Sequence, residues 1–99
     1  MKLIDPILQF QNELKLIRRA IHANPELSYE EFKTADLVAE KLTEWGIPII
    51  RGLGGTGVVG IISNGNSKRS VGLRADMDAL PLQELNDFAH KSVNAGKMH

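Results

Sequence analysis

Hydrophobic residues recur every three or four positions in the first half of the chain, and this spacing predicts amphipathic helices. The first helix is expected to begin at Asp5-Pro6, with Asp5 as N-cap and Pro6 at the first helical position. It should end near His22, because Asn24 precedes Pro25 and the residue before a proline avoids the α region. The apolar stripe that we expect to be buried comprises Ile7, Phe10, Leu14, Ile17 and Ile21.

A second helix is predicted to follow a capping box at Ser28-Tyr29-Glu30-Glu31, in which Ser28 and Glu31 bind each other's free amides. It should end before Gly46, because glycine commonly closes a helix in the left-handed conformation. Its expected core face comprises Phe32, Ala35, Val38 or Ala39, Leu42 and Trp45.

Beyond Gly46 the pattern changes to β-branched residues, which predict two strands, Ile47 to Arg51 and Gly57 to Ser63. The glycine cluster between them is interpreted as a tight turn. It contains Gly55-x-Gly57-x-x-Gly60, the spacing of the dinucleotide-binding fingerprint. That fingerprint requires a helix to begin at its glycines, whereas a strand is predicted here, so we reject a dinucleotide site.

The stretch Ser70 to Pro81 predicts a third strand that is buried and ends at a sheet edge. Its even and odd positions separate an apolar side (Val71, Leu73, Ala75, Met77) from a charged side (Arg74, Asp76, Asp78). The Asn64 to Arg69 connection is short enough for a hairpin, so this strand should pair antiparallel with the preceding one. The predicted fold is an α/β domain over residues 1–99, with two N-terminal helices packed on a mixed sheet that contains an antiparallel hairpin.

Asp76 and Asp78 are the candidate functional residues, and two interpretations of them remain open. Catalytic groups of α/β proteins often lie at the end of a strand, where these carboxylates are expected. Alternatively, Arg74 forms a structural ion pair with Asp76 or Asp78, and the D-x-D sequence simply opens a turn. The local pattern gives the two interpretations about equal weight.

Composition narrows the class of protein. The 99 residues are 42% hydrophobic and 24% charged with a net charge of zero, which fits one small globular domain. This balance provides no basic surface for nucleic acid or an anionic membrane. There is no cysteine, no apolar run of about 18 residues and no signal peptide, so we expect a cytoplasmic protein. The three histidines, His22, His90 and His99, have no local metal-binding spacing.

Three segments together resemble the metal-dependent amidohydrolases: H-A-N-P-E-L-S at His22 to Ser28, R-A-D-M-D-A-L-P at Arg74 to Pro81, and G-K-M-H at Gly96 to His99. That family includes hippurate hydrolase and the N-acyl-amino-acid and indole-acetyl-amino-acid hydrolases, and it is related to the co-catalytic zinc carboxypeptidases. The resemblance implies the N-terminal part of a single metallohydrolase catalytic domain with a zinc-exopeptidase-like fold. The full-length enzyme would use two divalent metal ions (zinc, manganese or cobalt) to cleave N-acyl amino acids.

The same resemblance implies that Asp78 lies beside the active site and orients a metal-binding imidazole, with Asp76 close by. His99 would be the first residue of a stretch that continues through a cysteine and two histidines. The metal ligands and the general-base glutamate are therefore expected beyond His99, with none in this chain. We accordingly expect an inactive fragment. The alternative is a stand-alone α/β module that works by association or by binding a ligand.

The predicted strands also present more apolar surface than two helices can cover. An uncovered strand edge or sheet face is a template for pairing with another chain. The sequence therefore predicts a homo-oligomer.

Overall fold

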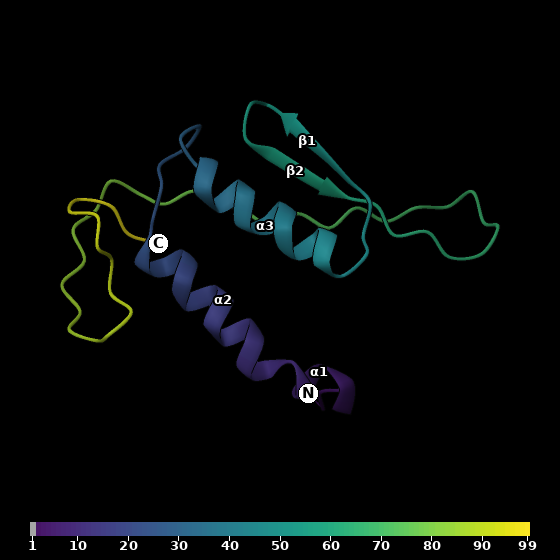
Figure 1. Ribbon diagram of the computed structural model, residues 1–99, viewed down its shortest axis with the longest axis horizontal. Coiled ribbons are helices and arrows are strands. Elements are labelled where there is room, and N and C mark those ends of the chain that lie inside the picture. Colours follow the sequence, from purple (N-terminus) through teal and green to yellow (C-terminus); the bar gives the residue numbers. More distant parts are fainter. Residues whose placement is uncertain (1) are drawn as a thin grey trace. The chain divides into compact units, whose positions relative to one another are not determined.

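The computed structural model describes residues 2–99, in which three helices precede a two-stranded antiparallel sheet (Figure 1). The helices are α1 (Asp5–Gln9), α2 (Gln11–Ala23) and α3 (Phe32–Glu44), and the strands are β1 (Ile49–Leu53) and β2 (Gly57–Gly60). The chain forms two compact units, one from the residues up to Pro25 with Leu80–His99, the other from Glu26–Ala79. The predicted α/β class, with N-terminal helices and an antiparallel pair of strands, is confirmed, and the strands that pair are β1 and β2.

The first predicted helix is present, but it is divided into α1 and α2 at Phe10. The expected N-cap role of Asp5 is wrong, because Ile4 is the N-cap and Asp5 lies in the first turn. The predicted end is confirmed to within one residue, since α2 ends at Ala23. Asn24, with φ −123° and ψ 59°, has left the α region before Pro25, as the proline rule requires.

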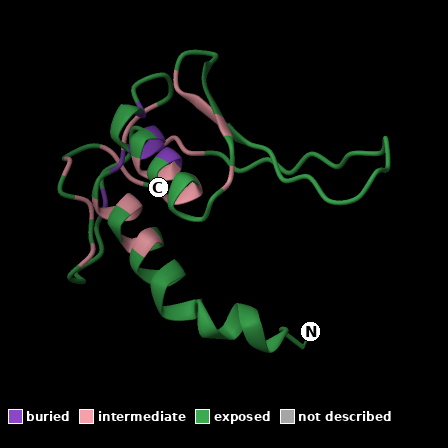
Figure 2. Cartoon of the chain, turned by 45° about the vertical axis from the view of Figure 1, so that its right-hand side comes forward, coloured by how far each residue is buried: buried purple, intermediate pink, exposed green. Residues whose placement is uncertain are grey.

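The expected burial of the α1–α2 stripe is wrong within the described chain. Neither helix has a buried residue, and Phe10 and Leu14 are 54% and 45% exposed (Figure 2). An amphipathic face is buried only where another element covers it. In this unit the partner is the Leu80–His99 segment, which contacts the end of α2 where the Val93 amide donates to the Ala23 carbonyl.

The capping box expected before α3 is also wrong. The N-cap is Glu31, and its side chain makes no capping hydrogen bond. Instead, the Glu26 carboxylate accepts hydrogen bonds from the Thr34 hydroxyl (2.6 Å), the Thr34 amide (2.7 Å) and the Lys33 amide (3.1 Å). Burial raises the pKa of Glu26, but these hydrogen bonds outweigh burial and leave the pKa below its ordinary value. A carboxylate from the preceding turn therefore binds the free amides at the start of α3.

The core of the second unit lies where α3 packs against the hairpin. It is built from small side chains, because Ala35 and Ala39 are only 2% and 4% exposed. The expectation that Phe32 and Trp45 belong to this core is wrong, since they are 61% and 48% exposed. Small residues allow the helix backbone to approach the strands closely, and the large side chains lie outside that contact.

The predicted end of α3 is confirmed. Gly46 has φ 72°, in the left-handed region that glycine adopts without steric cost. Its amide donates to Thr43 and the Ile47 amide donates to Leu42, each at 2.9 Å, and these two bonds form a Schellman motif.

The glycine cluster forms the turn of the β1–β2 hairpin, as predicted. The strands pair with Ile49 opposite Gly60, and the register shifts between Arg51 and Leu53. Gly57 is required by close packing, because an added Cβ would lie 2.4 Å from the Leu53 carbonyl oxygen. The Thr56 hydroxyl donates to Glu31 at 2.9 Å and so ties the turn to the start of α3.

The third predicted strand and its antiparallel pairing are wrong. Residues 61–78 form no strand in the described structure and leave the hairpin as a long excursion (Figure 1). Val71 and Leu73 are 87% and 96% exposed. Alternation marks a segment suited to a sheet, but a strand is stable only with a hydrogen-bonded partner, and these residues have none within the described chain. The next backbone pairing along the chain is at Ala79, which forms an isolated parallel bridge with Leu27.

Among residues 2–99, no helix has both the length and the apolar character needed to cross a membrane.

Candidate functional site

The two candidate carboxylates have different surroundings. Asp76 forms an ion pair with Arg74 at 3.0 Å, and the two side chains are 66% and 81% exposed. Such an exposed pair contributes about 0–1 kcal/mol. Asp78 is half-buried and makes no hydrogen bond or ion pair with other described residues. The ion-pair interpretation therefore applies to Asp76, and the Asp78 carboxylate is not engaged by Arg74.

Hydrogen bonds connect parts of the three family-like segments within the unit formed by the residues up to Pro25 and Leu80–His99. Leu80 and Met98 form an antiparallel bridge, with amide-to-carbonyl distances of 2.9 and 3.0 Å. The Asn94 side chain donates to the Pro25 carbonyl at 3.0 Å, and the Val93 amide donates to Ala23 at 2.9 Å. The segment that follows the D-M-D sequence thus lies beside G-K-M-H, and the loop between them is attached to H-A-N-P.

Glu84 holds this loop to α2, and the sequence analysis did not identify it. Its side chain is 2% exposed and accepts hydrogen bonds from the Ser92 amide (2.5 Å), the His22 Nε2 (2.9 Å) and the Asn86 side chain (3.1 Å). The Ser92 hydrogen bond is the largest influence and, with the others, it overcomes burial and lowers the pKa of Glu84 to about 2. His22 and Glu84 are 62 positions apart, so no local pattern could have indicated the pair.

The structure also gathers the three histidines, which the sequence separates. The His22 ring lies 5.9 Å from that of His90 and 6.5 Å from that of His99, measured between centroids. Phe88 stacks on His90 at 4.0 Å. Yet no group of three or more histidine, cysteine, aspartate or glutamate residues in the described chain could hold a metal ion. The His22 Nε2 is already bonded to Glu84, and residues 2–99 therefore do not fit a dinuclear metal centre.

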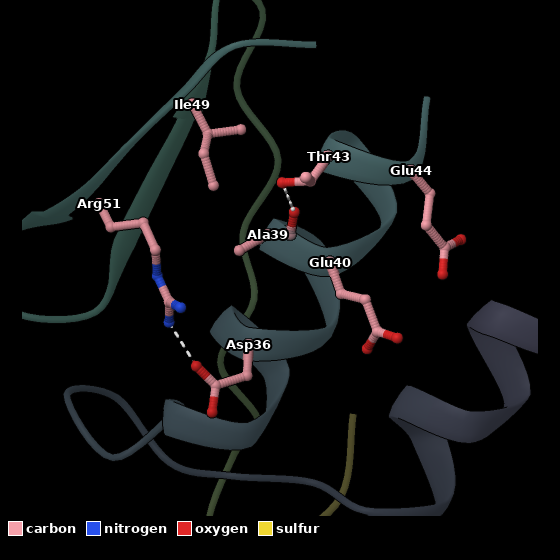
Figure 3. Close-up of a pocket in the computed structure, with 7 residues that line it drawn as sticks. All are labelled: Asp36, Ala39, Glu40, Thr43, Glu44, Ile49 and Arg51. Atoms are coloured by element: carbon pink, nitrogen blue, oxygen red, sulfur yellow. Dashed lines mark hydrogen bonds and ion pairs between the residues drawn. The ribbon is translucent and has the colours of Figure 1, made fainter. Parts of the chain in front are cut away.

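A hollow of about 550 Å³ lies between α3 and β1 in the other unit (Figure 3). Its polar groups are largely occupied by each other, because Arg51 pairs with Asp36 and the Thr43 hydroxyl donates to the Ala39 carbonyl. The remaining lining residues are Glu40, Glu44 and Ile49. No pair of a nucleophile and a base is present there, so the hollow is not a candidate active site.

The low pKa of Glu84 predicts how stability depends on pH. Because the pKa is about 2 in the folded chain and 4.5 without the fold, the unfolded chain takes up a proton first as the pH falls. The contribution of Glu84 should be complete above about pH 4.5 and lost as the pH falls to about 2. The urea concentration at the unfolding midpoint should fall over this pH range, and Glu84→Gln should make it depend less on pH.

Glu26, whose pKa is also lowered, contributes to the pH dependence in the same direction, so Glu26→Gln is the matched comparison. An unchanged profile in Glu84→Gln would contradict the assignment.

Comparison with known proteins shows that the chain is similar to parts of several longer hydrolases and carboxypeptidases. The chain is 52% identical over 99 residues to hippurate hydrolase of Campylobacter jejuni, covering all of this chain and 26% of that protein. It is 46% identical over 99 residues to thermostable carboxypeptidase 2 of Saccharolobus solfataricus, covering 99% of this chain and 25% of the relative. An IAA-amino acid hydrolase of Arabidopsis thaliana (ILR1-like 5) is 49% identical over 83 residues. This match covers 84% of this chain and 19% of the relative. No protein-family profile matches the sequence.

The fold leads to the same class. The YXEP protein of Bacillus subtilis, described as a dinuclear metal binding peptidase from the M20 family, superposes with a TM-score of 0.87 at 35% identity. The match covers 92% of this chain and 26% of YXEP. The helices and hairpin thus match a segment of a metal-binding peptidase of the M20 family. The chain is homologous to a segment of the metal-dependent amidohydrolases and peptidases of the M20 family, which confirms the resemblance, and it spans about a quarter of their length.

Proposed function

We propose that this chain forms part of a metal-dependent amidohydrolase that cleaves the amide bond of N-acyl amino acids of the hippurate type. The 52% identity to hippurate hydrolase over the whole chain is the observation that carries the proposal. Zinc, manganese or cobalt would supply Lewis-acid chemistry in the complete enzyme. Residues beyond His99 would hold the metal, because the described residues do not form a ligand set. The cytoplasmic location stays a prediction.

Within this enzyme, we propose that Asp78 accepts a hydrogen bond from a metal-binding imidazole and so fixes the orientation of that ring. Two observations support this role: Asp78 is half-buried, and its carboxylate is bonded to no described residue. Asp76 is the second carboxylate near the site, and its ion pair with Arg74 gives it a smaller part.

A chimera tests the proposed function. Residues 1–99 would replace the matching segment of the Campylobacter enzyme, and the purified, metal-loaded protein would be assayed with hippurate. We expect hydrolysis, because this segment should support the site that the rest of the enzyme completes. A dipeptide with a free amino group is the control substrate and distinguishes amidohydrolase from general peptidase activity. A folded chimera that holds metal and cleaves neither substrate would overturn the proposal.

We also propose that the chain by itself forms a homo-oligomer through its uncovered apolar segments. Ile62, Val71 and Leu73 are 80%, 87% and 96% exposed along one unpaired stretch. An unpaired backbone segment with exposed apolar side chains favours pairing with a second copy of the chain. Sedimentation at low micromolar concentration should show dimers or larger species, and Val71→Ser with Leu73→Ser should shift them toward monomer. A concentration-independent monomer would contradict this expectation.

A further inference from the structure

A small cavity of about 150 Å³ lies beside the C-terminal half of α2. Neither Asp76 nor Asp78 is among the residues that line it. It is lined by Arg18, Arg19, His22, Phe88 and His90. At about 30 Å³ for each water in the liquid, the cavity has room for about five water molecules. Two arginines and two histidines therefore line a space large enough for a small ligand.

The charges around this cavity are mostly positive and are not neutralised. Neither Arg18 nor Arg19 forms an ion pair with a described acidic residue. Glu84 is the acidic side chain nearby, and its oxygens already bind His22, Asn86 and Ser92. Two long cationic side chains thus line a cavity without a carboxylate partner of their own.

The lowered pKa of His90 is a second sign of positive charge around the cavity. Burial lowers the pKa of His90, and the positive charges of Arg19, His22 and Arg18 lower it further. Glu84 opposes them but does not reverse the shift. An additional cation is thus disfavoured beside the cavity, which is the condition that favours an anion.

The end of a helix normally opposes anion binding, because its free carbonyls carry partial negative charge. At the end of α2, three of the last four carbonyls accept hydrogen bonds. The Asn24 side chain donates to Ala20 at 3.0 Å, the Asn24 amide donates to Ile21 at 3.1 Å, and the Val93 amide donates to Ala23 at 2.9 Å. The usual repulsion is therefore reduced.

We propose that this cavity binds a small oxyanion, a carboxylate or a phosphate, held by the guanidinium groups of Arg18 and Arg19 with His22 and His90 beside it. The planar fork of guanidinium N–H groups matches the oxygens of either anion. Phe88, stacked on His90 with an interplanar angle of 15°, provides a flat wall that holds the imidazole in place.

The test is a titration of the 99-residue chain with sodium phosphate and, separately, with sodium acetate, at constant ionic strength and pH. The NMR signals of the His22 and His90 ring protons report the cavity. We expect saturable shifts, with Arg19→Gln weakening the affinity about tenfold or more, because it removes charge-assisted hydrogen bonds. Lys15→Gln removes the same charge from the same helix without lining the cavity, and it should leave the affinity unchanged.

The outcomes separate the possible ligands. Tighter binding of phosphate assigns the cavity to a phosphoryl group, and equal or tighter binding of acetate assigns it to a carboxylate. Circular dichroism of each variant confirms that α2 is intact, and Arg18→Gln provides an independent second variant. Shifts that do not saturate with either anion, or an affinity that falls equally in Arg19→Gln and Lys15→Gln, would overturn the proposal.

Discussion

The 99-residue chain by itself should hydrolyse no hippurate, with or without added zinc, manganese or cobalt. A catalytic zinc ion needs about three protein ligands, with a further position left for water or substrate. No set of three suitable side chains exists among the described residues. The His22 Nε2 is bonded to Glu84 at 2.9 Å. Release of glycine from hippurate, measured against a blank that contains metal alone, provides the assay.

The chimera with the Campylobacter enzyme is the positive control for this expectation, because it tests the same residues with the remainder of a catalytic domain present. Turnover by the isolated chain that increases with added metal and disappears with a chelator would contradict the prediction. It would show that the chain assembles a metal site on its own or between copies.

Replacing Asp78 by Asn in the active chimera should lower kcat/KM about 10–100-fold, the usual effect of removing the partner of a metal-binding imidazole. The melting temperature should change little, because Asp78 makes no hydrogen bond or ion pair within the described chain. Metal content measured on the same samples shows whether the loss follows weaker metal binding. This combination distinguishes a functional carboxylate from a structural one.

Asp76→Asn is the matched control, because it changes a neighbouring carboxylate by the same single atom. It removes an exposed ion pair with Arg74 that contributes about 0–1 kcal/mol, so turnover should fall less than in Asp78→Asn. Near-normal turnover in Asp78→Asn together with a large fall in melting temperature would assign Asp78 a structural role. An equal loss of turnover in both variants would show that the two carboxylates act together.

Much of the local structure could be predicted because its causes lie within a few residues. Pro25 ends α2 by restricting the residue before it, and Gly46 closes α3 because its left-handed conformation has no steric cost. The glycine cluster forms the hairpin turn for the same reason. The three family-like segments also indicated the resemblance to the metal-dependent amidohydrolases, because residue types at fixed positions are a property of the sequence itself.

Tertiary structure decided the features that depend on distant partners. Val71 and Leu73 alternate like strand residues, but without a neighbouring strand in the described chain they are exposed. Glu26, two positions before the expected cap Ser28, took the place of the predicted capping box because its carboxylate accepts hydrogen bonds from the Lys33 and Thr34 amides.

The same holds for the side chains that gather around α2. Glu84 and His22 are 62 positions apart. The backbone bridge between Leu80 and Met98 and the bonds from Val93 to Ala23 and from Asn94 to Pro25 bring that loop to the helix. The backbone conformation that a residue prefers depends on its neighbours in the sequence. A buried charge is instead stabilised by hydrogen-bond donors that the fold brings close to it, and these can be distant in the sequence. The sequence alone therefore determined the C-terminal ends of α2 and α3, the hairpin turn and the resemblance to the metal-dependent amidohydrolases. The tertiary fold decided which carboxylates accept hydrogen bonds and which histidine rings lie close together.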